Sequence, residues 1–170
     1  SAMRARRSAR GAEPRANRDR YLVDYDRLNE GVIGRTLDAA SPSTAFWPSS
    51  PSGGRGDYSD NWHDDSRGDM HFWSVWHEGK PFSAYREVSP RFCSEFGFQS
   101  FPSLETVRTF ADEASLNVTS PVMEHHQRHP RGNALIVETL ARYFRLPGSF
   151  ADFIYLSQVQ QAEAMRTAVE

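Results

Sequence analysis

Glu95 is the residue whose type and surroundings most clearly suggest chemistry. It lies in residues 91–101, a short aromatic-rich stretch followed by Pro102, which is typical of a buried strand that runs into a loop. A carboxylate between Phe96 and Phe98 is costly to bury unless it is paired with a cation or used in a reaction. Two interpretations are therefore open, a catalytic carboxylate or a strand-end glutamate in a salt bridge with a nearby arginine.

The elements that would position Glu95 follow from the pattern around it. Short apolar runs predict three strands, at residues 44–47, 69–73 and 91–95. Helical spacing of apolar residues, with Ser103 and Ser149 as capping residues, predicts helices over residues 18–37, 103–110 and 133–144 and from residue 149 onward. Strands that alternate with helices favour an α/β fold with a parallel sheet.

Two of these helices carry apolar faces that we expect to pack on the sheet. The face of the first is formed by Tyr21, Leu22, Tyr25, Leu28, Val32 and Ile33. The face of the last is formed by Phe153, Leu156, Val159 and Ala162. Asp152, three residues after Ser149, completes a pattern similar to a capping box.

Length and composition describe a chain with a modest core. It has 170 residues, of which 38% are hydrophobic, with a formal net charge of −2 and one cysteine. A whole (β/α)₈ barrel usually takes ~250 residues, so only part of one fits here. No apolar run approaches the ~18 residues of a membrane span, and nothing resembles a signal peptide. We expect no membrane partner; the compartment is unknown, with the cytoplasm favoured over secretion.

The first 20 residues differ from the rest. They carry seven arginines against Glu13 and Asp19, and no aromatic residue precedes Tyr21. A basic arm can bind nucleic acid, but without aromatic residues or a recognition fold a frayed segment is the better interpretation. We therefore assign residues 1–20 to a disordered leader, which starts with a cloning remnant, and residues 21–170 to the folded part. No nucleic-acid partner is predicted.

Thiol and metal chemistry are the weaker hypotheses. Cys93 is the single cysteine, and most such residues are small core residues rather than nucleophiles. Two stretches rich in histidine, residues 63–71 and 124–129, lack the His-Glu-x-x-His spacing that puts two ligands on one helix face. Both are interpreted as polar loops, and no metal site is predicted.

The sequence around Glu95 resembles the nucleophile segment of β-mannosidases in glycoside hydrolase family 2. The resemblance runs through most of the chain from about residue 20 onward. The segments that carry it are residues 48–51 (PSSP), 68–77 (GDMHFWSVWH), 91–106 (RFCSEFGFQSFPSLET), 123–127 (MEHHQ) and 155–162 (YLSQVQQA). It implies part of a TIM (β/α)₈ barrel, three of the eight strand–helix units, the fifth to the seventh. Residues 21–170 would then be a C-terminal part of a glycosidase catalytic barrel.

The resemblance assigns roles to four residues. It implies that Glu95 is the nucleophile and that Trp73, Trp76 and His71 bind substrate; loop-anchoring core remains the alternative for the tryptophans. Hydrolysis with retention normally needs a second carboxyl group as acid/base. In the family this glutamate ends a Trp-x-Gly-Asn-Asn-Glu pattern, which the sequence lacks. Glu30 follows Asn29 but falls within a helical period, so we expect the acid/base residue outside this chain.

The predicted function is therefore that of a retaining β-mannosidase. It would remove terminal β-D-mannosyl units from an oligosaccharide or glycoconjugate, without a cofactor. Alone, the chain is expected to be inactive and to self-associate. The alternatives are an exo-β-glucosaminidase or β-galactosidase of the same family, or a non-catalytic carbohydrate-binding fragment.

Overall fold

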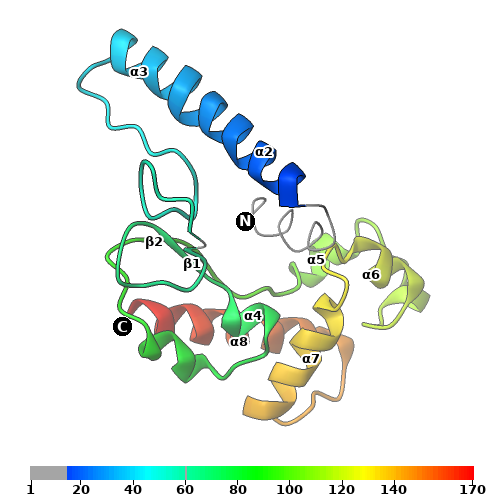
Figure 1. The fold of residues 1–170 in the computed structure, drawn as a ribbon. Helices are drawn as coiled ribbons and strands as arrows, with labels where there is room; N and C mark the ends of the chain where they lie inside the picture. Colours follow the sequence, from blue (N-terminus) through cyan, green and yellow to red (C-terminus); the bar gives the residue numbers. More distant parts are fainter. Residues whose placement is uncertain (1–14, 60) are drawn as a thin grey trace. The chain divides into compact units, whose positions relative to one another are not determined.

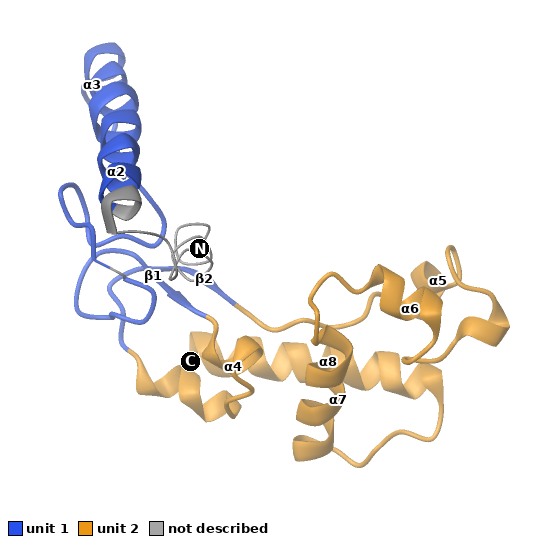
Figure 2. Ribbon diagram, turned by 45° about the vertical axis from the view of Figure 1, so that its right-hand side comes forward, with its two compact units in different colours: residues 1–72, 89–96 blue, residues 73–88, 97–170 orange. Residues whose placement is uncertain are grey.

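The computed structural model describes residues 15–59 and 61–170, which form two compact units (Figure 2). Unit 1 comprises the described residues up to Phe72 together with Ser89–Phe96. Unit 2 comprises Trp73–Val88 and Gly97–Glu170. The chain leaves unit 1 twice, each time at the last residue of a strand.

Unit 1 begins with a long helix. The α-helix α2 (Arg15–Asp26), the π-helix η1 (Arg27–Gly34) and the α-helix α3 (Arg35–Ala40) follow one another directly (Figure 1). They confirm the helix predicted at residues 18–37. The helix starts at Arg15, within the segment assigned to the leader. The rest of the leader, residues 1–14, lies outside the described residues.

The apolar face of this helix is not packed on a sheet as predicted. Leu28, Val32 and Ile33 are exposed. The helix instead makes polar contacts with the loop that follows it, in which Asp26 accepts from Tyr58, Glu30 from the Gly56 N–H, and Asp38 from Arg55. The physical reason is the width of the sheet, because two strands spaced by about 4.8 Å cannot cover a helix of this length.

The sheet of unit 1 has two parallel strands, β1 (Met70–Phe72) and β2 (Cys93–Phe96). They confirm two of the three predicted strands and the parallel α/β order. The strand predicted at residues 44–47 is wrong. That segment pairs with neither β1 nor β2, and a strand exists only through such pairing.

Unit 2 is helical. Between β1 and β2 in sequence lie α4 (Ser74–His77) and the 3₁₀-helix η2 (Phe82–Glu87). After β2 come α5 (Leu104–Val107), the 3₁₀-helix η3 (Glu113–Ser115), α6 (Pro121–His126), α7 (Gly132–Tyr143) and α8 (Phe150–Val169). The predicted caps are confirmed, since Ser103 and Ser149 each accept a hydrogen bond from the backbone of the first turn. No helix in the described part of the chain is long and apolar enough to cross a membrane.

The helix α8 is the longest helix of unit 2, and it packs against η2 and α7. Its buried face shares only Phe153 with the predicted one, because the buried residues are Phe153, Ile154, Ser157, Gln160, Ala164 and Thr167. Polar side chains are buried there because they satisfy the backbone of the segment after β2. The Ser157 hydroxyl accepts from the Phe101 N–H at 3.1 Å, and Gln161 donates to the Phe98 carbonyl at 2.6 Å. The polar side chains of α8 thereby fix the backbone of residues 98–101, which follow β2 in the sequence.

Candidate active site

Glu95 lies near the end of β2, and its side chain is 49% exposed. The strand was predicted to be buried, and this is wrong, because both Ser94 and Glu95 face solvent. β2 stops at Phe96 since Gly97 adopts φ +158°, a conformation that favours glycine. A Cβ at this position would meet the Trp73 ring at 3.5 Å. Glu95 therefore lies one residue before the end of the strand.

His71 on β1 lies directly opposite Glu95 in the parallel ladder. Its Nδ1 is 3.1 Å from Glu95 Oε2, although the ring is not aligned for a good hydrogen bond. The His71 side chain is 1% exposed, and the Trp62 ring packs edge-on against it with 5.9 Å between ring centroids. The structure thus brings together two of the four predicted site residues, a buried imidazole and an exposed carboxylate.

A chain of hydrogen bonds continues behind His71. The Ser50 hydroxyl is 2.8 Å from His71 Nε2, and it donates to Asp69 Oδ2 at 2.6 Å. The other oxygen of Asp69, Oδ1, accepts from the Ser94 hydroxyl at 2.5 Å and from the Ser94 N–H at 3.2 Å. The two hydroxyl oxygens are 2.9 Å apart. Glu95 is therefore an exposed member of a polar chain that runs through the buried Asp69.

The environment of His71 acts on its pKa in two directions. Burial lowers the pKa of His71 because the imidazolium loses its hydration, and the negative charges of Glu95 and Asp69 raise it. Burial is the larger effect, so the pKa of His71 lies below its ordinary value of 6.5. A buried group whose pKa is shifted both by burial and by a specific charge partner is a candidate for a functional site.

Trp73 and Trp76, the other two predicted site residues, belong to unit 2. Trp76 is buried and packs edge-on against Phe98, with 5.1 Å between ring centroids. Trp73 keeps part of its surface exposed and lies 5.5 Å from the His77 ring. Trp76 is thus buried in unit 2 and Trp73 is partly exposed, and a contact of either ring with substrate stays a prediction.

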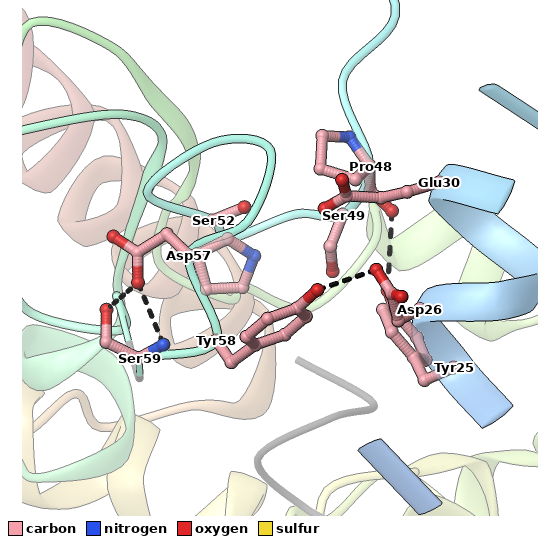
Figure 3. A pocket seen from close by; sticks show the side chains of 10 residues that line it. Tyr25, Asp26, Glu30, Pro48, Ser49, Ser52, Asp57, Tyr58 and Ser59 are labelled. Carbon is pink, nitrogen blue, oxygen red and sulfur yellow. Dashed lines mark hydrogen bonds between the residues drawn. The ribbon is translucent and has the colours of Figure 1, made fainter. Parts of the chain in front are cut away.

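Glu30, which follows Asn29 as the acid/base residue of the family follows an asparagine, makes a contact within unit 1. Glu30 lies on η1, where its carboxylate accepts a hydrogen bond from the Gly56 N–H at 2.8 Å. Figure 3 shows it beside a cavity in which Tyr58 donates to Asp26. That cavity holds about 20 Å³, which is room for a water molecule but not for a sugar. Glu30 is a structural contact on the helix surface.

Cys93 is not activated as a nucleophile. Burial raises the pKa of its thiol above the ordinary value of 9.0, which disfavours the reactive thiolate. In the part of the chain that the structure describes, no three histidine, cysteine, aspartate or glutamate side chains are grouped so that they could hold a metal ion.

Three residues of the polar chain were not predicted: Ser50, Asp69 and Ser94. Each lies in a segment that carried the family resemblance, Ser50 in the PSSP motif, Asp69 just before β1 and Ser94 beside Glu95. Their types gave no signal, because serine and aspartate are frequent in loops. The register that puts Asp69 beside Ser94 was the missing information.

Comparison with known proteins gives consistent results. The chain is 29% identical over 161 residues to a beta-mannosidase of Rattus norvegicus, a match that covers 88% of this chain and 18% of the rat protein. It is 34% identical over 148 residues to beta-mannosidase B of Aspergillus niger, covering 86% of this chain and 16% of the fungal protein. No family model matches.

A solved structure shows the same likeness. The crystal structure of a beta-D-mannosidase from Dictyoglomus thermophilum superposes with a TM-score of 0.76 at 32% sequence identity, over 85% of this chain and 17% of that one. The likeness in sequence and fold thus places the chain among glycoside hydrolases, as a piece of one. More particularly, the chain belongs to the β-mannosidase family, which confirms the resemblance found in the sequence. It spans about a sixth of the length of the curated relatives it matches.

Proposed function

We propose that this segment supplies the nucleophile of a retaining β-mannosidase, and that the nucleophile is Glu95. The observation that carries the proposal is the pairing of an exposed carboxylate at the end of β2 with the buried His71 on β1. The β-mannosidase relatives support the substrate class, a terminal β-D-mannosyl unit. β1 and β2 would be the sixth and seventh strands of a (β/α)₈ barrel, with Glu95 at the carboxyl-terminal face where such enzymes carry their chemistry.

The reaction has two steps. The Glu95 carboxylate attacks the anomeric carbon of the mannosyl unit while the bond to the leaving oxygen breaks, and that oxygen takes a proton from the acid/base residue. The product of this step is a mannosyl ester of Glu95. Water, deprotonated by the same acid/base residue, then attacks the anomeric carbon while its bond to the Glu95 oxygen breaks. Mannose leaves with its configuration retained, and the Glu95 carboxylate is restored.

The acid/base residue is proposed to lie outside this sequence, so the 170-residue chain should not turn over substrate by itself. General acid catalysis alone is typically worth ~10²–10⁴-fold in rate. The measurement is release of nitrophenol from a nitrophenyl β-mannoside by the purified chain. Activity that disappears in Glu30→Gln would instead make Glu30 the acid/base residue.

The decisive experiment traps the ester in a full-length polypeptide that contains this segment. A fluorinated mannosyl donor slows the second step, so the label should accumulate on the peptide that contains Glu95. Glu95→Gln should abolish labelling and reduce turnover by several orders of magnitude, because a neutral amide is a poor nucleophile. Glu87 and Glu105 are the nearby glutamates that should remain unlabelled, and a label on either would overturn the assignment of Glu95 as the nucleophile.

Substrate choice within the family needs a separate measurement. Relative rates on nitrophenyl β-mannoside, β-glucosaminide and β-galactoside separate the proposed activity from that of an exo-β-glucosaminidase or a β-galactosidase. Affinity of the 170-residue chain for mannose, with no turnover by the full-length polypeptide, would favour a carbohydrate-binding role instead.

A further inference from the structure

The hydrogen-bonding capacity of Asp69 fixes the direction of the bonds around it. Its two oxygens receive the hydroxyl protons of Ser50 and Ser94 and the Ser94 N–H, which is the pattern of an ionised carboxylate. A serine hydroxyl has a single proton. Because Ser50 gives that proton to Asp69, its oxygen can act only as an acceptor toward His71.

The direction of these bonds fixes the tautomer of His71. The 2.8 Å contact between Ser50 Oγ and His71 Nε2 requires the proton to be on Nε2. A neutral imidazole then presents the lone pair of Nδ1 to Glu95 Oε2, only 3.1 Å away. Two acceptors at this distance repel each other, so the contact is favourable only when a proton lies between them.

We propose that His71 is a positioning residue for Glu95, and that the two share one proton whose place is set by Ser50 and Asp69. In one form the proton is on Nδ1, and an imidazolium holds the Glu95 carboxylate. In the other it is on Glu95, and the imidazole is neutral. His71 is buried and bonded to Ser50 through Nε2, and this places Nδ1 3.1 Å from Oε2 of a side chain that is otherwise half exposed.

This arrangement gives His71 a role that rests on the proposed function but differs from binding substrate. The imidazolium form keeps Glu95 ionised and oriented before it attacks. When the carboxylate becomes an ester its charge disappears, and the imidazolium loses its partner. Glu95 and Asp69 are the charged side chains that face the ring among the described residues, so the titration of His71 should report on these two.

Nuclear magnetic resonance of the 170-residue chain tests the pairing without any need for activity. With ¹⁵N-labelled histidine, the ring nitrogens report both the tautomer and the titration across about pH 5 to 8. The His71 signals are assigned by their absence in His71→Gln. In Glu95→Gln the pKa of His71 should fall by about one unit or more, since a carboxylate at this distance favours the charged ring.

Ser50→Ala gives a second, independent signature. Without the hydroxyl that accepts from Nε2, neutral His71 should move its proton to Nδ1 and donate it to Glu95. Ser59→Ala is the matched control, because Ser59 is a serine of the same unit whose hydroxyl donates to Asp57 rather than contacting the histidine. An unchanged tautomer in Ser50→Ala, or an unchanged His71 titration in Glu95→Gln, overturns the proposal. Failure of the mannosyl label to reach Glu95 would overturn the proposed function and leave the proton pairing standing.

Discussion

Unit 1 and unit 2 differ in the kind of side chain that each buries in its core. Unit 2 buries a set of large apolar side chains that includes Val75, Phe82, Phe98, Ile136, Leu140 and Phe153. In the described part of unit 1, Met70 and Phe72 are the large hydrophobic residues of the core, and several others along α2, η1 and α3 are exposed. Buried polar residues such as Asn61, Asp69 and His71 take the place of an apolar core there.

This difference suggests how the chain divides its work. Burial of a large apolar side chain is worth about 1.5–3 kcal/mol, whereas a typical hydrogen bond contributes about 1 kcal/mol net. Unit 2 can therefore draw its stability from packing. Unit 1 depends on many small directional contacts, and those contacts are also what fixes the protons around His71 and Glu95.

The largest expected effect separates the two units with one type of substitution. Leu140 is fully buried on α7, and Leu28 is 55% exposed on η1. Leu140→Ala should lower the free energy of unfolding by about 2–5 kcal/mol, because it removes packed atoms and leaves a cavity. Leu28→Ala should change it by less than about 0.5 kcal/mol. Urea unfolding measures both, and a large loss in Leu28→Ala would mean that another surface covers this face of the helix.

A buried amide of unit 1 should produce a smaller but still clear effect. Asn61 is 1% exposed, and its Nδ2 donates to the carbonyls of Arg67 at 2.9 Å and Asp69 at 2.8 Å. Asn61→Ala removes this donor from both carbonyls, and the Asp69 carbonyl keeps only the Ser52 N–H, so the cost should be about 1–3 kcal/mol. Hydrogen exchange should show lost protection at the amides of Ser52 and Asp69, each of which donates to the carbonyl of the other residue. Protection at α7 should not change; equal loss in both units would contradict the division.

The helices at residues 18–37, 103–110, 133–144 and from 149 onward were predictable because local signals determine them, whereas α4, η2, η3 and α6 were not predicted. Ser103 and Ser149 accept the hydrogen bonds expected of capping residues, and α7 begins and ends within one residue of its predicted range. Two apolar runs predicted the strands at residues 69–73 and 91–95, and the alternation of strands and helices along the chain predicted their parallel order. Family resemblance then singled out Glu95, which composition alone left undecided between catalysis and a salt bridge.

The rest depended on long-range pairing that no local pattern encodes. The buried face of α8 includes Ser157 and Gln160, which periodicity of apolar residues cannot find because these positions are polar. They are buried since they bond to backbone groups distant in sequence. The same holds for Ser50 and Asp69, whose partners lie on other segments. Conversely, the apolar face at Leu28 predicted packing on a sheet that has too few strands to provide it.

The smallest expected effect concerns acid pH. Hydrogen bonds from Ser59 hold the pKa of Asp57 below its ordinary value of 3.8, and those from Ser66 do the same for Asp64, with Arg67 adding to both. A carboxyl whose pKa is lowered by folding contributes stability above its unfolded pKa and loses it as the pH falls through the folded value. The stabilisation from these two loops should therefore be complete at neutral pH and disappear below about pH 4.

Amide spectra recorded from about pH 5 down to pH 2 should follow this loss directly. The N–H groups of Ser59 and Ser66 donate to these carboxylates at 2.9 Å and 3.0 Å, so their signals should shift or exchange first. The amides of α7 should hold, because Ile136 and Leu140 are buried whatever the charge on these aspartates. In Asp57→Asn with Asp64→Asn, the acid transition of the loop should vanish and its amides should be weakly protected at every pH. If the α7 amides exchange before those of Ser59 and Ser66, the polar unit is not the acid-sensitive one, and the contrast between the two units does not extend to pH.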